Sequence, residues 1–137
     1  MKVLIALVLL IAAIFVSVVL WSFWEPSDIQ KGSFAYRFKV TEDAQTFPVW
    51  NQVSVPKYDV NIADGEKPSA TILRYDSSLM LGALMDKARI ANFSCQQFEP
   101  NAAICDKDMS DGRSQQLLFQ KDSDEKYSQV KVLFIGY

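Results

Sequence analysis

The chain begins with an uninterrupted apolar run from Val3 to Phe23, and no other feature constrains its structure as strongly. At a rise of about 1.5 Å per residue, a helix of this length spans roughly 31 Å, which matches the ~30 Å hydrocarbon core of a bilayer. No Asp, Glu, Lys or Arg interrupts the run, so it gives no sign of an ion path or a proton relay. We therefore predict that residues 1–24 form a single transmembrane anchor.

A cleaved secretory signal peptide is the main alternative, because it also follows a positive charge at the N-terminus. The apolar region of a signal peptide contains about 7 to 15 residues and ends at a site of small residues. The present run is longer, and it ends in Trp21-Ser22-Phe23-Trp24, which offers no such site. Trp21 and Trp24 suit the membrane–water interface, where an indole ring stays in the acyl boundary while its N–H remains hydrated. These features favour an uncleaved anchor.

The charges on either side of the run predict its orientation. Lys2 precedes the run, whereas Glu25 and Asp28 follow it. The positive-inside bias therefore places the N-terminus in the cytoplasm and the rest of the chain outside it, in the periplasm if the source is bacterial. Pro26 and Gly32 interrupt any continuation of the helix, so we predict a short tether over residues 25–32 and an extracytoplasmic domain over residues 33–137.

Composition narrows the functions that this domain can perform. From residue 25 onward the chain contains 13 basic and 16 acidic residues without a basic cluster, which argues against nucleic acid as a partner. Histidine is absent from the whole sequence, which excludes Ser-His-Asp and Cys-His catalysis and His-ligated zinc. We expect no cofactor, no metal site and no enzymatic activity.

The two cysteines, Cys95 and Cys105, predict a structural disulfide, with two free thiols as the alternative. Residues 93–98 and 102–105 flank Glu99-Pro100-Asn101, which is a plausible hairpin loop. If residues 98 and 102 close that loop, Cys95 lies directly opposite Cys105, at a Cα separation of about 4.5 to 5.5 Å. This separation suits a disulfide, so the hairpin and the bridge support each other.

Alternating apolar and polar residues predict further strands. They are residues 34–40, a hairpin formed by 58–63 and 70–75 around Asp64-Gly65, and a last pair formed by 115–121 and 126–137. The last segment is apolar on both faces, so we expect a central strand that is covered on both sides. Prolines at positions 48 and 56 reduce residues 46–55 to an edge strand or a loop.

One segment outside the anchor has helical periodicity. Ser77 or Ser78 suits the N-cap of a helix over residues 79–91. The apolar residues at helical spacing on one face of this helix are Met80, Leu81, Leu84, Met85, Ala88 and Ala91. The expected fold class is α+β, with an N-terminal single transmembrane helix followed by a small antiparallel-sheet domain of five to seven strands and one packed helix.

Two short motifs suggest sites but have ordinary explanations. Asp106, Asp108 and Asp111 precede Gly112, yet their spacing differs from that of an EF-hand loop, so we predict a solvated acidic loop. Asn92-Phe93-Ser94 matches an N-glycosylation acceptor, a motif short enough to occur by chance.

The leading functional hypothesis is a membrane-anchored accessory, assembly or structural subunit that holds an interaction domain close to the bilayer and binds a membrane-protein partner. Ala13 and Ser17 form a small-xxx-small pair that would permit close contact with another helix, although a lipid-facing helix also contains small residues. The alternative is a membrane-tethered module that binds a small ligand or a protein between its helix and its sheet.

Overall fold

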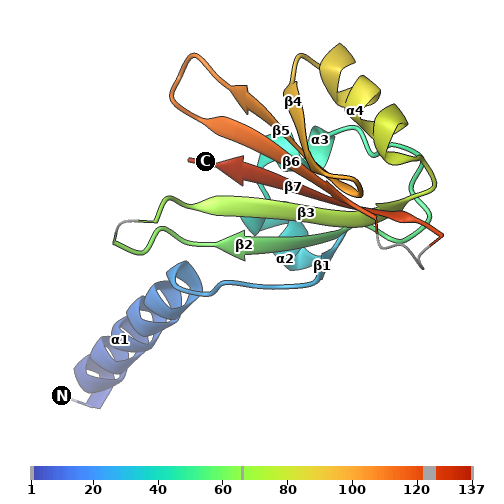
Figure 1. The fold of residues 1–137 in the computed structure, drawn as a ribbon. Coiled ribbons are helices and arrows are strands. Elements are labelled where there is room, and N and C mark those ends of the chain that lie inside the picture. The colour runs from blue at the N-terminus through green and yellow to red at the C-terminus, as the bar shows by residue number, and fades with distance from the viewer. Residues whose placement is uncertain (1, 66, 122–125, 137) are drawn as a thin grey trace.

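The computed structural model describes residues 2–65, 67–121 and 126–136, and its fold is α+β, as predicted (Figure 1). The elements in chain order are α1 (Lys2–Ser22), β1 (Ile29–Gln30), α2 (Phe34–Lys39), α3 (Glu42–Thr46), β2 (Lys57–Asn61), β3 (Ala70–Ser77), α4 (Leu81–Ile90), β4 (Ser94–Glu99), β5 (Ala102–Asp108), β6 (Ser114–Gln120) and β7 (Ser128–Ile135). Helix α1 projects away from the rest of the chain, whereas the other helices pack against one sheet.

The seven strands form a single antiparallel sheet in the order β1-β2-β3-β7-β6-β5-β4. Strand β7 lies at the centre, between β3 and β6, which confirms the predicted position of the final strand. Its pairing with β3 runs from Ser77 opposite Ser128 to Ala70 opposite Ile135. The last strand of the chain therefore joins the two halves of the sheet.

Only one face of this sheet is covered by helices. Strand β7 buries Val130, Val132 and Phe134 on that face, where Leu84 of α4 also enters the core. The prediction that both faces of β7 are covered is wrong, because Lys131 on the other face is exposed. The apolar residues on that face are only half-buried, since they are shielded by neighbouring side chains of the sheet rather than by a second layer.

Residues 34–40 were expected to be a strand, and this prediction is wrong, because residues 34–39 form helix α2. Ser33 caps the helix, its hydroxyl accepting a hydrogen bond from the Tyr36 amide at 3.2 Å. Tyr36 turns inward against Tyr58, with ring centroids 5.0 Å apart. The alternating aromatic side chains are compatible with a strand and with a short helix. The Ser33 cap and the contact between Tyr36 and Tyr58 favour the helix.

The segment predicted as a tether packs against the domain along most of its length. Pro26 and Ile29 are buried, and Ile29 pairs with Tyr58 as part of strand β1. The Val60 amide donates a hydrogen bond to the Pro26 carbonyl at 3.0 Å. The Asp28 amide donates to the Asp59 carboxylate at 2.8 Å. The chain is thus held by the sheet within a few residues of the end of α1.

The predicted hairpins are present. Strands β2 and β3 join around Asp64-Gly65, and β4 pairs with β5 so that Cys95 lies opposite Cys105. The register shifts between Gln97 and Glu99, which leaves Phe98 in a bulge and pairs Glu99 rather than Phe98 with Ala102. The predicted closure of the loop by residues 98 and 102 is therefore wrong. The extra residue in the bulge restores the predicted register beyond it, so that Gln97 lies opposite Ala103 and Cys95 opposite Cys105.

The predicted helix over residues 79–91 is observed as α4, but its serine cap is not. Met80 occupies the N-cap position without a side-chain hydrogen bond. The Ser77 hydroxyl instead accepts a hydrogen bond from the Leu79 amide at 3.2 Å and donates to the Trp50 carbonyl at 2.7 Å. Residues 47–56 form a loop, apart from an isolated bridge between Gln52 and Ser77. Residues 122–125, which connect the last two predicted strands in the sequence, lie outside the described residues.

Candidate functional site

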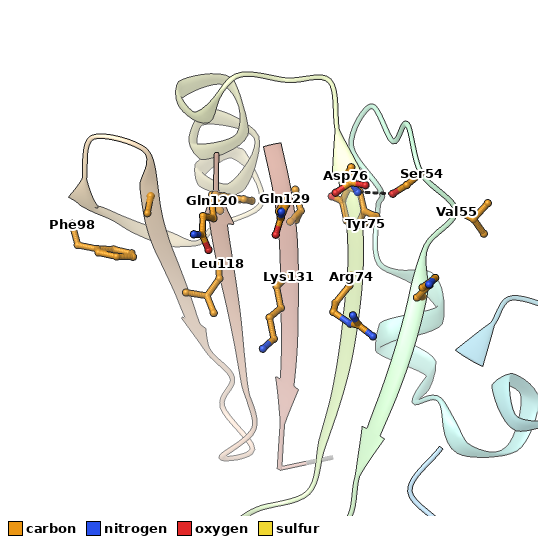
Figure 2. A pocket seen from close by; sticks show the side chains of 14 residues that line it. Ser54, Val55, Arg74, Tyr75, Asp76, Phe98, Leu118, Gln120, Gln129 and Lys131 are labelled. Carbon is orange, nitrogen blue, oxygen red and sulfur yellow. Dashed lines mark hydrogen bonds between the residues drawn. The ribbon is translucent and has the colours of Figure 1, made fainter. Parts of the chain in front are cut away.

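The uncovered face of the sheet carries a groove of about 570 Å³. Its floor is formed by β3, β7 and β6, where Arg74, Lys131 and Leu118 lie side by side in the register of the sheet (Figure 2). The next row toward the far end of the strands contains Asp76, Gln129 and Gln120. The complete lining is Ser54, Val55, Lys57, Arg74, Tyr75, Asp76, Phe98, Ala102, Leu118, Phe119, Gln120, Gln129, Val130 and Lys131.

Two exposed apolar side chains stand at opposite sides of the groove. Val55 comes from the loop before β2, and Phe98 comes from the bulge in β4, where 58% of its surface is exposed. Figure 2 shows these residues on either side of the central strands. The bulge thus has a specific effect on the groove, because it supplies the aromatic ring of one wall.

Hydrogen bonds fix the opposite wall against the sheet. The Asp76 amide donates to the Ser54 hydroxyl at 2.7 Å (Figure 2), and the Val53 amide donates to the Asp76 carbonyl at 2.8 Å. The loop that carries Val55 is consequently joined to Asp76 of β3 through Val53 and Ser54. The groove is therefore largely preformed, as binding sites usually are.

The charges of the groove are distributed unevenly. Near β2, the Arg74 guanidinium contacts the Asp59 carboxylate at 2.7 Å and the Asp28 carboxylate at 3.2 Å. The hydrogen bond to Asp59 raises the pKa of Arg74. Lys57 also reaches Asp28, at 3.4 Å. By contrast, the ion pairs among the described residues do not include Lys131, which lies beside Leu118.

This arrangement suits the binding of a group that is part apolar and part polar. An apolar side chain can rest on Leu118 and Phe98, while the Lys131 ammonium supplies a hydrogen-bond donor for an anionic or carbonyl oxygen. The tyrosine beneath the groove, Tyr75, points its hydroxyl away from it, since that oxygen accepts a hydrogen bond from the Trp50 amide at 3.3 Å on the covered face. Burial raises the pKa of Tyr75 to about 12, so it stays protonated near neutral pH.

The structure places the predicted disulfide at the β4 edge of the sheet. Cys95 and Cys105 are directly opposite and joined, with their Cα atoms 4.0 Å apart, and Cys105 is fully buried. Cys105 belongs to the core cluster, on the face opposite the groove, and Cys95 packs against that cluster. The bridge thus serves the fold and takes no part in the groove.

The predicted membrane-interface and helix-contact residues all belong to α1 or its end. Trp21 and Trp24 contact each other, with ring centroids 4.9 Å apart. Ala13 and Ser17 lie one turn apart, on the side of α1 that also bears Trp21. The Ser17 hydroxyl donates to the Ala13 carbonyl at 2.8 Å, so its proton is already engaged within the helix. Contact with another helix stays a prediction.

The acidic loop after β5 is organised by an arginine. Arg113 contacts the Asp111 carboxylate at 2.7 Å and the Asp43 carboxylate of α3 at 3.0 Å. Hydrogen bonds from the Arg113 backbone and side chain lower the pKa of Asp111. Within residues 2–65, 67–121 and 126–136, no group of three or more His, Cys, Asp or Glu side chains could hold a metal ion. In the acceptor motif at 92–94, Asn92 is exposed and Phe93 is buried.

The groove was not among the sequence predictions, which placed a binding site between the helix and the sheet. In the structure that space is filled by core side chains, including Leu84, Leu117 and Phe119. The sequence contains one indication of the groove, which is that Arg74 and Lys131 alternate with apolar residues along their strands. Strand order and register are needed to bring them together, and sequence periodicity does not supply these.

Comparison with protein-family models, with curated proteins and with solved structures finds no match for this chain. One described helix, at Val3–Ser22, is long and apolar enough to cross a membrane, although an N-terminal signal sequence meets the same criterion.

Proposed function

We propose that this chain is a single-pass membrane-anchored accessory subunit whose extracytoplasmic domain binds a segment of a membrane-protein partner. The groove on the uncovered face of the sheet is the observation that carries this proposal. It combines preformed walls, two exposed apolar side chains and an ammonium group, which together suit a peptide segment with an apolar side chain and a nearby oxygen acceptor.

The anchor supports the choice of a membrane partner. Helix α1 has no buried residue among those that would span the bilayer, and its chain enters the sheet within a few residues of Ser22. A domain held this close to a bilayer meets partners in the same membrane at a high effective concentration. The extracytoplasmic orientation agrees with the disulfide, since disulfides persist in oxidising compartments.

Photo-crosslinking in intact membranes tests the proposed interaction. A photoreactive amino acid at Leu118 or Phe98 should form an adduct with one recurrent membrane protein. The matched control is Ile90, which is 81% exposed at the end of α4 and lies away from the groove. Adducts of equal yield from position 90, or repeated recovery of the chain alone from positions 98 and 118, would contradict a partner in the groove.

Two further measurements test the anchor and its orientation. The intact mass of the protein from membranes should include residues 1–24, and a mature chain that begins after Trp24 would show that the segment is a cleaved signal. Protease added to spheroplasts or right-side-out membrane vesicles, which expose a periplasmic domain as well as an extracellular one, should digest the domain while the anchoring membrane is intact. Protection of the domain would reverse the proposed orientation.

A small-ligand-binding module is the second candidate function, because the groove volume falls within the range of about 300 to 1,000 Å³ that is typical of small-molecule sites. Native mass spectrometry of the full chain from membranes would separate the two candidates. A bound small molecule that the Lys131→Ala variant loses favours the module, whereas a copurifying protein favours the subunit. The expectation of a non-enzymatic role rests on the absence of histidine from the sequence.

A further inference from the structure

A continuous aromatic surface joins the end of α1 to helix α2. Its members, here called the aromatic collar, are Trp21, Trp24, Phe34 and Phe38. The Trp21 ring lies 4.9 Å from that of Trp24 and 5.4 Å from that of Phe34, and Phe34 lies 4.6 Å from Phe38, all between ring centroids. The collar therefore extends the apolar surface of α1 onto the folded domain.

Helix α2 divides its side chains between the core and this collar. Tyr36 is buried against Tyr58, whereas Phe34 and Phe38, which are one turn apart, are 66% and 61% exposed. Two exposed phenylalanines on one turn of a helix form an unusual surface for contact with water, since their burial in an apolar phase is favourable. Their arrangement is that of an amphipathic helix that lies at a membrane surface.

Cationic side chains flank the collar. The Lys39 ammonium donates a hydrogen bond to the Trp21 carbonyl at 2.7 Å and lies 4.9 Å from the centre of the Trp21 ring. Arg37 is exposed between Phe34 and Phe38 in the sequence. Basic side chains beside aromatic rings are typical of the headgroup region, where the rings reach the acyl boundary and the cations face phosphate.

We propose that the aromatic collar lies in the lipid headgroup layer and that α2 is an interfacial helix that seats the domain on the bilayer. The inference rests on the membrane anchor of the proposed function. Each headgroup layer is about 5 to 8 Å thick, and Phe34 lies 5.4 Å from Trp21 at the end of the span, so both rings fit within one layer. Continuity with the span identifies lipid, rather than a second protein, as what covers Phe34 and Phe38.

Contact of α2 with the bilayer would fix the orientation of the domain relative to the membrane. The hydrogen bond from Lys39 ties α2 to the last turn of α1, and the buried Tyr36 ties α2 to the sheet. The bilayer is thus contacted at two places, by α1 and by α2, so rotation of the domain about the chain near Glu25 is restricted. The groove would then face one defined direction relative to the membrane.

Lipid photo-crosslinking with the purified full chain tests the inference. The chain is reconstituted into vesicles of phosphatidylcholine with a minor fraction of phosphatidylglycerol, and benzoylphenylalanine replaces Phe15, Phe34, Phe38 or Phe98 in separate variants. Phe15 lies within the span, and Phe98 is a matched control because it is similarly exposed but belongs to the opposite edge of the sheet. Mass spectrometry then measures the lipid adduct formed per chain.

We expect positions 34 and 38 to form lipid adducts in yields close to that of position 15 and several-fold above that of position 98. If position 15 reacts with lipid but 34 and 38 do not, the seating is wrong while the anchor stands. If position 15 also fails, the anchor of the proposed function is wrong, and the seating with it. Adducts between two copies of the chain at positions 34 and 38 would identify a dimer contact and overturn the inference.

Discussion

The disulfide between Cys95 and Cys105 allows a quantitative prediction about stability. The two residues are separated by 10 positions, and closing a loop of this length removes about 9 cal/mol/K of entropy from the unfolded chain. At 25 °C this corresponds to about 2.7 kcal/mol of stabilisation. For a domain of about 110 residues, losing this amount should lower the unfolding midpoint by about 12 °C.

The assay compares three forms of the full chain in detergent micelles, with Trp50 fluorescence following unfolding in denaturant. The oxidised and reduced wild type contain the same atoms apart from the bridge, so their difference isolates the effect of the cross-link. The Cys95→Ala/Cys105→Ala variant also loses two sulfur atoms, one of which is fully buried, and should be less stable than the reduced protein. Added reductant should leave this variant unchanged.

Equal stability of the oxidised and reduced wild type would refute the chain-entropy reasoning. Alkylation of free thiols followed by mass measurement must accompany the comparison, because it shows whether the bridge was present before reduction. A bridged protein whose stability does not depend on reduction would mean that the β4–β5 hairpin already restricts the unfolded chain.

Three further predictions concern the core. Burial raises the pKa of Tyr75 from its ordinary value of 10.0 to about 12. The protonated side chain therefore contributes fully to stability below pH 10, and this contribution is lost as the pH rises through 12. In denaturant titrations, the unfolding free energy of Tyr75→Phe should fall less over this pH range, and the variant also loses the hydrogen bond from the Trp50 amide. Leu84→Ala should lower the unfolding free energy by about 2 to 5 kcal/mol, because the side chain is fully buried. Ile90→Ala on the same helix should change the unfolding free energy by less than about 0.5 kcal/mol. A loss for Leu84→Ala as small as that for Ile90→Ala would place α4 outside the core. Deletion of residues 132–137 should abolish folding, since β7 joins both halves of the sheet, and a truncated chain that resists protease would contradict that topology.

Local chemistry and pairing arithmetic predicted a large part of the fold. The loop before Ala102 led to the correct pairing of Cys95 with Cys105, although the bulge at Phe98 shifts the pair that closes it. The apolar character of residues 126–137 was enough to place the last strand at the centre. Both inferences succeed because register and burial leave a direct pattern in neighbouring residues.

The errors arise where tertiary contacts decide between patterns that local sequence permits. Phe34, Tyr36 and Phe38 alternate as in a strand, yet the Ser33 cap and the contact of Tyr36 with Tyr58 belong to a helix. The apolar side chains on both faces of β7 suggested two covering layers, whereas one face stays open around Lys131. The groove depends on the order of the six strands β2 to β7 and on a bulge, which no single segment encodes.

In the proposed membrane-anchored state, the bulge at Phe98 has a consequence for copies of the chain that share one membrane. Strand β4 is the outer strand of the sheet, and an unbroken outer strand would offer its free backbone groups to the sheet of a neighbouring copy. Chains that are confined to the plane of a membrane meet one another frequently. The bulge at Phe98 interrupts the ladder of β4 and shortens the row that a neighbour can pair with, and at the opposite edge β1 is only two residues long. The two ends of the sheet thus discourage fibre-like growth by edge-to-edge pairing.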